Sequence, residues 1–182
     1  LPLIDDALTR GEQGEAPLEQ AARTEAALLW FFYTSALAEV MTCTFDARDC
    51  DDVWAYYQGG TRRDSPLGLG AYIDVLGNET HDRAFDALLA VRCWRDLDPS
   101  TTVTDVDSIG FRDAAFAQLD RATLRGLALV ARDRFTRLDC PDAEAARAEL
   151  AFLKVLVPLL DRAARARIPE KADVLRAQVE QD

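Results

Sequence analysis

Histidine is nearly absent from this sequence, and its scarcity removes several kinds of catalysis. Only one of the 182 residues is histidine, His81. A Ser-His-Asp or Cys-His site would have to use it, and a di-iron carboxylate bundle needs Glu-x-x-His pairs on two helices. His81 stands between Thr80 and Asp82, which are ordinary capping residues for a helix start. We therefore predict a structural role for His81.

Other motifs of catalysis and cofactor binding are missing as well. The sequence has no Cys-x-x-Cys zinc pair, no glycine-rich loop of nucleotide-binding form and no Gly-x-Ser-x-Gly elbow. An enzyme that uses paired Asp or Glu side chains as acid and base is the one catalytic alternative left open. The expectation is a protein that is not an enzyme and has no resident cofactor, with calcium as the one candidate ion.

Positive charge is also scarce. The 21 basic and 32 acidic residues give a formal net charge of -11 at pH 7. Such a charge repels phosphate backbones and anionic lipid surfaces, which argues against nucleic-acid binding. Only Lys154 and Lys171 are lysines, and the other basic residues are arginines. Together with abundant alanine, this usage indicates a GC-rich genome, and we expect a bacterial protein.

No apolar run is long enough to cross a membrane. The most apolar stretch, residues 21–43, has a fully apolar part shorter than the roughly 20 residues that a bilayer requires, with Arg23 and Glu39 close by. A membrane span is the rival interpretation and fails on that length. A helix here would have no wide hydrated face, so we predict a central helix over about residues 17–43 that other helices enclose.

The rest of the chain has helical periodicity, without a regular strand pattern or a convincing repeat. Glycine, proline and capping residues predict six further helices after the central one. The first is short, capped by Asp49 or Asp51 and ended by Gly59-Gly60; the second spans residues 66–76; the third begins at Thr80 and has a face of Phe85, Leu88, Leu89, Cys93 and Leu97. The fourth spans residues 111–138, the fifth begins at Pro141 and is kinked at Pro158, and the sixth spans residues 169–179. We predict a single all-α domain, residues 1–182, built as an orthogonal or up-down bundle of six to eight helices. Residues 1–15 would be peripheral and residues 98–110 a long loop.

Four cysteines are an even number, which fits two disulfides. Cys43 closes the central helix and Cys50 opens the next one across six residues, so we predict a Cys43–Cys50 bond, and by elimination Cys93–Cys140. The alternative is four buried free thiols in a cytosolic protein. Disulfides persist mainly outside the reducing cytosol, so we expect an extracytoplasmic protein, periplasmic or secreted. The chain begins at Leu1 rather than at methionine, as a processed or trimmed chain would.

An acidic turn is the best candidate for a metal site. It contains Asp46, Asp49, Asp51 and Asp52, whose carboxylates suit a hard cation such as calcium, although the spacing is not that of an EF-hand. A second acidic cluster, in the long loop, consists of Asp98, Asp105 and Asp107. The alternative for both clusters is a solvated loop with helix-capping aspartates.

The most unusual composition follows that turn. Residues 53–72 combine aromatic side chains, glycines and adjacent arginines, and we predict a surface patch for a ligand or partner formed by Trp54, Tyr56, Tyr57, Arg62 and Arg63. The two arginines would hold an anionic group. The alternative is that the aromatic residues pack in the core and the arginines balance the excess of acids.

Glu39 in the central helix needs a partner if it is buried, because an isolated buried charge is costly. We predict an ion pair with Arg92. Taken together, the sequence predicts a non-enzymatic binding or interaction module for an unknown protein or small ligand, without nucleic acid and without a membrane span. The alternative is a carboxylate-based periplasmic protein that binds calcium or takes part in metal uptake.

Overall fold

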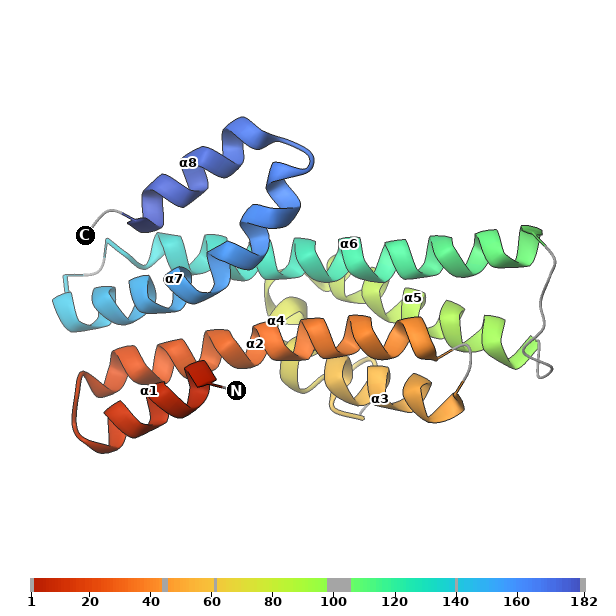
Figure 1. The fold of residues 1–182 in the computed structure, drawn as a ribbon, viewed down its shortest axis with the longest axis horizontal. Coiled ribbons are helices and arrows are strands. Elements are labelled where there is room, and N and C mark those ends of the chain that lie inside the picture. Colours follow the sequence, from red (N-terminus) through yellow and green to blue (C-terminus); the bar gives the residue numbers. More distant parts are fainter. Residues whose placement is uncertain (1, 44–45, 61, 98–105, 140, 181–182) are drawn as a thin grey trace. The chain divides into compact units, whose positions relative to one another are not determined.

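The structure is a computed structural model that describes residues 2–43, 46–60, 62–97, 106–139 and 141–180. Within these residues the chain forms eight α-helices and no strand, which confirms the all-α prediction (Figure 1). The helices are α1 (Pro2–Glu12), α2 (Pro17–Thr42), α3 (Ala47–Gln58), α4 (Gly68–Leu76), α5 (Asn78–Leu97), α6 (Val106–Thr136), α7 (Ala143–Arg165) and α8 (Pro169–Glu180). None of these helices is long and apolar enough to cross a membrane.

The helices belong to two compact units. Unit 1 comprises residues 1–31 and 128–182, and unit 2 comprises residues 32–127. The boundaries fall inside α2 and α6, so each of these helices contributes residues to both units. The single domain expected from the sequence stays a prediction, and the two units are described in turn.

The ends of α3 in unit 2 show how local chemistry sets a helix. Asp46 is extended and its carboxylate accepts a hydrogen bond from the Arg48 backbone N–H at 2.8 Å, so the helix begins one turn earlier than predicted. At the other end Gly59 has φ +69° and donates its backbone N–H to the Ala55 carbonyl. A left-handed backbone conformation favours glycine, because glycine carries no Cβ. The predicted end of this helix at Gly59 is confirmed.

The buried face of α5 differs from the predicted one. Phe85 and Leu88 are buried, but Leu89 and Cys93 are exposed, and Ala84 and Val91 complete the buried face instead. A ladder of steps of four residues advances about 40° too far at each step in a helix of 3.6 residues per turn. The predicted face therefore turns away from the core. Residues that follow one another at alternating intervals of three and four positions stay on the side of the helix that faces the core.

The second predicted disulfide involves this exposed position. Cys93 has a free, exposed thiol, and its predicted partner Cys140 lies outside the described residues. The pairing was inferred by elimination, which carries no geometric information. The first predicted disulfide is present, because Cys43 and Cys50 are bonded with their Cα atoms 4.6 Å apart.

The central helix α2 is buried along one stripe rather than on every side. The stripe recurs at steps of three and four, which is the period of one helix face. Its residues are Ala22, Ala26, Leu29, Tyr33, Ala36 and Val40. Leu28 and Met41 are exposed, so enclosure on all sides was an overestimate drawn from the apolar composition.

Three helical segments of unit 1 meet at Arg134. Its guanidinium on α6 donates to Glu25 of α2 at 2.5 Å and to Glu149 of α7 at 3.0 Å, and it lies 4.2 Å from the centre of the Phe152 ring. The Arg134 side chain is only 15% exposed. Charge pairing and stacking at one side chain therefore join the three segments.

Helices α7 and α8 belong to unit 1, as does α1. Asp142 caps α7 by accepting hydrogen bonds from the Glu144 and Ala145 backbone N–H groups. Pro158 lies inside α7, where it cannot donate to the carbonyl four residues earlier, and Figure 1 shows α7 changing direction along its length. Helix α8 packs on α7 and buries Ala172 and Val179.

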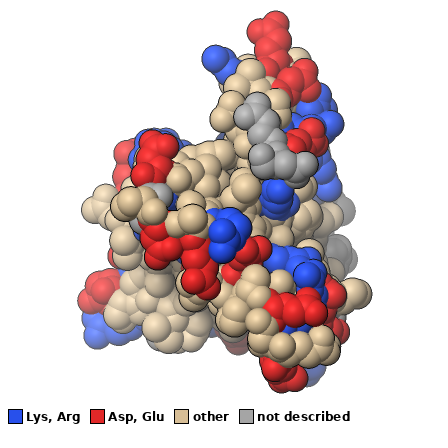
Figure 2. Space-filling model, turned by 90° about the vertical axis from the view of Figure 1, so that its left-hand side faces the viewer, with Lys and Arg blue, Asp and Glu red and all other residues tan. Residues whose placement is uncertain are grey.

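The molecular surface carries both signs of charge despite the acidic excess. Figure 2 shows basic and acidic side chains interspersed over the face that it draws. Ion pairs within unit 1 include Arg147–Glu19 at 3.0 Å and Arg10–Glu15 at 2.8 Å. Exposed pairs of this kind contribute little to stability, so they are not evidence of a site.

Candidate functional site

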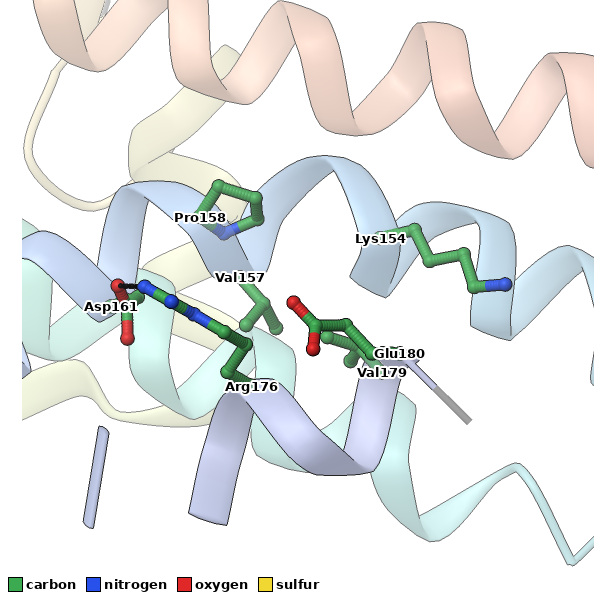
Figure 3. Close-up of a pocket in the computed structure, with 7 residues that line it drawn as sticks. All are labelled: Lys154, Val157, Pro158, Asp161, Arg176, Val179 and Glu180. Carbon is green, nitrogen blue, oxygen red and sulfur yellow. Dashed lines mark hydrogen bonds and ion pairs between the residues drawn. The ribbon is translucent and has the colours of Figure 1, made fainter. Parts of the chain in front are cut away.

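A pocket of about 640 Å³ lies between α7 and α8 in unit 1 (Figure 3). Its lining residues are Lys154, Val157, Pro158, Asp161, Arg176, Val179 and Glu180. The pocket is within the roughly 300–1,000 Å³ typical of small-molecule sites. Its walls combine an apolar centre with a few charged groups, which is the usual composition of such a site.

The apolar part of the pocket comes from both helices. Val157 of α7 and Val179 of α8 are almost fully buried, whereas Pro158 is exposed beside them. Pro158 and Val157 are adjacent in the chain, and Val179 approaches them from the facing helix in Figure 3. Pro158 is therefore the exposed apolar side chain of the lining, and the two valines contribute the small part of their surface that stays accessible.

Asp161 is the buried charge of the pocket. Its carboxylate accepts hydrogen bonds from the Arg165 Nη2 at 2.9 Å and from the Arg176 Nη2 at 2.7 Å. Arg165 also donates to Asp173 at 2.9 Å. Hydrogen bonds from the two guanidinium groups, Arg165 first, lower the pKa of Asp161, so the carboxylate stays ionised at neutral pH.

This pocket was not found from the sequence. Each helix was predicted correctly, but no local pattern says that α8 folds back onto α7. The available signal was Asp161, an acid directly after the apolar face residue Leu160, with Arg165 one turn later. An acid at the edge of a buried face needs a cation from its own helix or from the next one.

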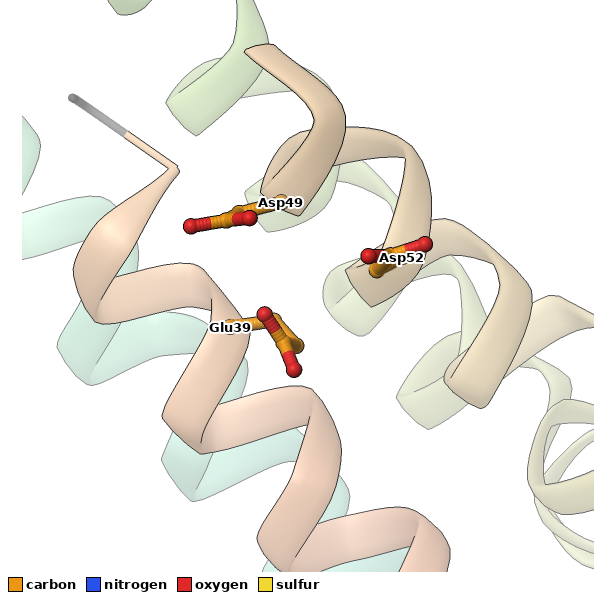
Figure 4. A group of neighbouring side chains, drawn as sticks. All are labelled: Glu39, Asp49 and Asp52. Atoms are coloured by element: carbon orange, nitrogen blue, oxygen red, sulfur yellow. The ribbon is translucent and has the colours of Figure 1, made fainter. Parts of the chain in front are cut away.

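A second feature lies in unit 2, where three carboxylates converge. Glu39 of α2 and Asp49 and Asp52 of α3 each offer an oxygen, and these oxygens all lie within 4.8 Å of one another (Figure 4). All three residues are half-buried. The disulfide holds the two helices here, because Cys43 lies one turn after Glu39 and Cys50 directly follows Asp49.

The chemistry of this cluster suits a hard cation. Three carboxylates provide up to six oxygens, and calcium takes six to eight oxygen ligands. Without a cation the three negative charges repel one another. Exposed acidic groups are nevertheless common in proteins that bind no ion, so the donor set alone does not establish a site.

The acidic turn is thus only partly the cluster that was predicted. Asp49 and Asp52 belong to it, but Asp46 caps α3 and Asp51 forms an ion pair with Arg92 at 3.3 Å. Glu39 was not predicted as a ligand. The predicted Cys43–Cys50 bond was the signal for it, because that bond places the last turn of α2 beside the first turn of α3.

The second predicted acidic cluster lies in the long loop. Asp98 and Asp105 lie outside the described residues, as does the side chain of Asp107. The loop itself is shorter than residues 98–110, because α6 begins at Val106.

The predicted Glu39–Arg92 ion pair is wrong. Arg92 is half-exposed and bonds Asp51, and Glu39 lies with two other carboxylates. The prediction assumed that Arg92 is buried because its neighbours in the sequence are apolar. In α5, however, Val91 takes the buried position and Arg92 is turned outward by one helical step.

Tyr57 does not belong to a surface patch. It is fully buried, and its hydroxyl lies 3.1 Å from the Nδ1 atom of His81, which is also buried. The His81 Nε2 atom lies 3.1 Å from the Arg63 carbonyl, which can only accept, so Nε2 carries the proton and Nδ1 accepts from Tyr57. Burial raises the pKa of Tyr57 above its usual value. A structural role for His81 agrees with this geometry.

The other patch residues divide between core edge and surface. Trp54 is half-buried and packs edge-to-face on Phe85, with ring centres 4.8 Å apart. Arg63 lies 4.5 Å from the centre of the same ring and pairs with Asp82 and Asp86. Its charge is therefore already matched by two acids.

Tyr56 and Arg62 complete the predicted patch. Tyr56 is half-buried, and Arg62 is exposed and forms an ion pair with Asp64 at 3.6 Å. The structure thus distributes the five residues over different environments, and the α7–α8 pocket is the better candidate for a ligand site.

Comparison with known proteins assigns no function to the pocket or to the carboxylate cluster. No family model, no curated protein and no solved structure matches the chain.

Proposed function

We propose that this chain is a non-enzymatic binding module of an exported bacterial protein, and that the α7–α8 pocket holds its ligand. The observation that carries the proposal is a pocket of about 640 Å³ in which buried valines lie next to an ion-paired Asp161 and Arg176. Apolar walls supply affinity, and a few placed charges supply orientation. Neither the apolar walls nor the placed charges require a catalytic residue.

The amphipathic dye anilinonaphthalene sulfonate tests the pocket. We expect its fluorescence to rise on binding to the native protein and the rise to be lost in Val179→Phe, which places a larger side chain in the apolar part of the pocket. Val174→Phe is the matched control, because Val174 lies on the same helix and is exposed outside the pocket lining. Circular dichroism melts would establish that both variants fold. An equal dye signal in all three folded proteins would overturn the proposal.

An exported location is supported by the Cys43–Cys50 disulfide, since such bonds persist mainly in oxidising compartments. Protein isolated without reductant and then denatured is expected to show fewer titratable thiols than its four cysteines. Four free thiols would contradict export.

A second candidate function is binding of a divalent cation, favoured by the convergence of Glu39, Asp49 and Asp52. Calcium at roughly millimolar concentration, the range of extracellular calcium modules, should raise the melting temperature. Asp49→Asn should abolish the rise. Asp51→Asn is the matched control, because Asp51 pairs with Arg92 outside the cluster. A rise of equal size in both variants would exclude this cluster as the cause.

A further inference from the structure

We infer that the ligand of the α7–α8 pocket is a small zwitterion with an apolar body, of the size and charge spacing of a short apolar peptide with free termini. The inference rests on the proposed function, since it names the chemistry that the same pocket would recognise. It is carried by the placement of Arg176 and Glu180 on either side of the apolar surface.

Arg176 is suited to bind a carboxylate. One of its N–H groups donates to Asp161, and a guanidinium has five such donors in a planar fork. Its side chain is 48% exposed and lines the pocket, so donors remain available on the open side. Asp161 keeps the guanidinium in place and, through its own bonds to Arg165, stays ionised. A ligand carboxylate would therefore meet a preoriented partner.

Glu180 is suited to bind an ammonium group. It follows Arg176 by one helical turn, a spacing at which opposite charges often pair, although a base before an acid is the less favourable order. In the described part of the chain no ion pair joins these two residues, because Arg176 turns to Asp161 across the pocket. Figure 3 shows the Glu180 carboxylate extending over the pocket between Arg176 and Lys154.

The attachment points of these two side chains are about as far apart as the termini of a dipeptide. Side chains four residues apart on a helix have Cβ atoms about 5–6 Å apart, and flexible stems carry the charged groups beyond them. Consecutive Cα atoms of a peptide are about 3.8 Å apart, which places the terminal ammonium and carboxylate of an extended dipeptide about 6 Å from each other. Apolar side chains of such a ligand would lie against Val157, Pro158 and Val179.

The balance of charge in the lining supports a zwitterion over an ion of one sign. Two bases, Lys154 and Arg176, face two acids, Asp161 and Glu180. A ligand with only a carboxylate would be repelled by the negative charge of Glu180, with no positive group of its own near that residue. A ligand with only an ammonium group would be repelled by Arg176 and Lys154 in the same way. A zwitterion with the matching orientation satisfies both ends.

Three related peptides test this inference by titration calorimetry on the whole chain. The probes are leucyl-leucine, its N-acetyl derivative, which lacks the ammonium group, and its amide, which lacks the carboxylate. We expect leucyl-leucine to bind at least about tenfold more tightly than either blocked peptide, because each block removes one charge-assisted hydrogen bond.

Two variants assign the ends of the ligand. Glu180→Gln should remove the preference for leucyl-leucine over its N-acetyl derivative, and Arg176→Gln should remove the preference over its amide. Lys171→Gln is the control, because Lys171 is an exposed residue of α8 outside the lining and should change neither preference.

The outcomes separate this inference from the function on which it rests. Equal binding of the three peptides, lost in Val179→Phe, would overturn the zwitterion while supporting the pocket. Binding of the dye but of no peptide would also overturn the zwitterion alone. If neither dye nor peptide binds in the pocket, both proposals are wrong.

Discussion

The buried Tyr57 hydroxyl should make stability depend on alkaline pH. The pKa of Tyr57 is raised in the folded state, so the unfolded chain ionises first, near pH 10. Below that pH both states hold the proton and stability is unaffected. As pH rises above about 10, proton loss favours the unfolded state and stability falls. Denaturant unfolding at a series of alkaline pH values would measure this slope.

The control for that slope is Tyr57→Phe, which has no ionisable group at this position. It should also lower stability by about 1–3 kcal/mol at neutral pH, because the Nδ1 atom of buried His81 loses its donor. A slope as steep in this variant as in the native protein would show that other groups cause it.

Gly126 is required by the packing of α6 on Ile73 of α4. A Cβ at this position would lie 2.5 Å from the Ile73 Cδ1 and Cγ1 atoms. Alanine is favoured over glycine inside a helix by about 1 kcal/mol, but forcing an extra methyl group against Ile73 costs about 1–3 kcal/mol. We expect Gly126→Ala to destabilise the protein on balance in denaturant unfolding. Adding Ile73→Ala should make the glycine substitution less costly, whereas additive effects would contradict this account.

At the scale of elements, Arg134 makes a separate prediction. Arg134→Ala should lower the free energy of unfolding by about 2 kcal/mol or more, because Glu25 and Glu149 lose the guanidinium between them and Phe152 loses its stacking partner. Arg134→Lys should recover only part of the loss, since an ammonium group cannot bond both acids in a fork while stacking. Full recovery by lysine would indicate that charge alone matters.

Helix ends were largely predictable because they depend on neighbouring residues in the chain. Pro17 and Pro169 begin α2 and α8 as expected, and Gly59 ends α3, whereas α7 begins two residues after the expected Pro141, with Asp142 as its cap. Helix faces were less predictable. The buried face of α5 was predicted from residues spaced four apart, including Cys93. Four residues advance slightly more than one full turn of the helix, so Cys93 lies at the surface instead of in the core.

The candidate sites were the least predictable part, because they join separate helices. Asp49 and Asp52 were identified from composition, but Glu39 joins them only through the disulfide geometry. The pocket depends on how α8 returns along α7, and the sequence signal that bears on that return is Asp161, an acid at the edge of the buried face of α7 that needs a cation. Arg176 and Asp161 meet across it although fifteen positions separate them.

At the scale of the molecule, the net charge of -11 predicts a response to salt. An excess of one sign repels itself, and salt screens that repulsion between exposed groups. Sodium chloride should therefore raise the melting temperature modestly. Calcium chloride at equal ionic strength should raise it further only if the carboxylate cluster binds the ion, which separates screening from specific binding. A melting temperature that falls with sodium chloride would contradict net self-repulsion.

The division of α2 and α6 between units has a consequence for the order of folding. Unit 2 is continuous in sequence, whereas unit 1 combines residues 1–31 with residues 128–182. A chain that emerges from the ribosome amino end first therefore completes unit 2 while the second part of unit 1 is still being made. Once unit 2 has formed, its two ends are held at one separation, and the entropy lost in joining the halves of unit 1 is smaller. The carboxylate cluster would thus be assembled before the ligand pocket exists.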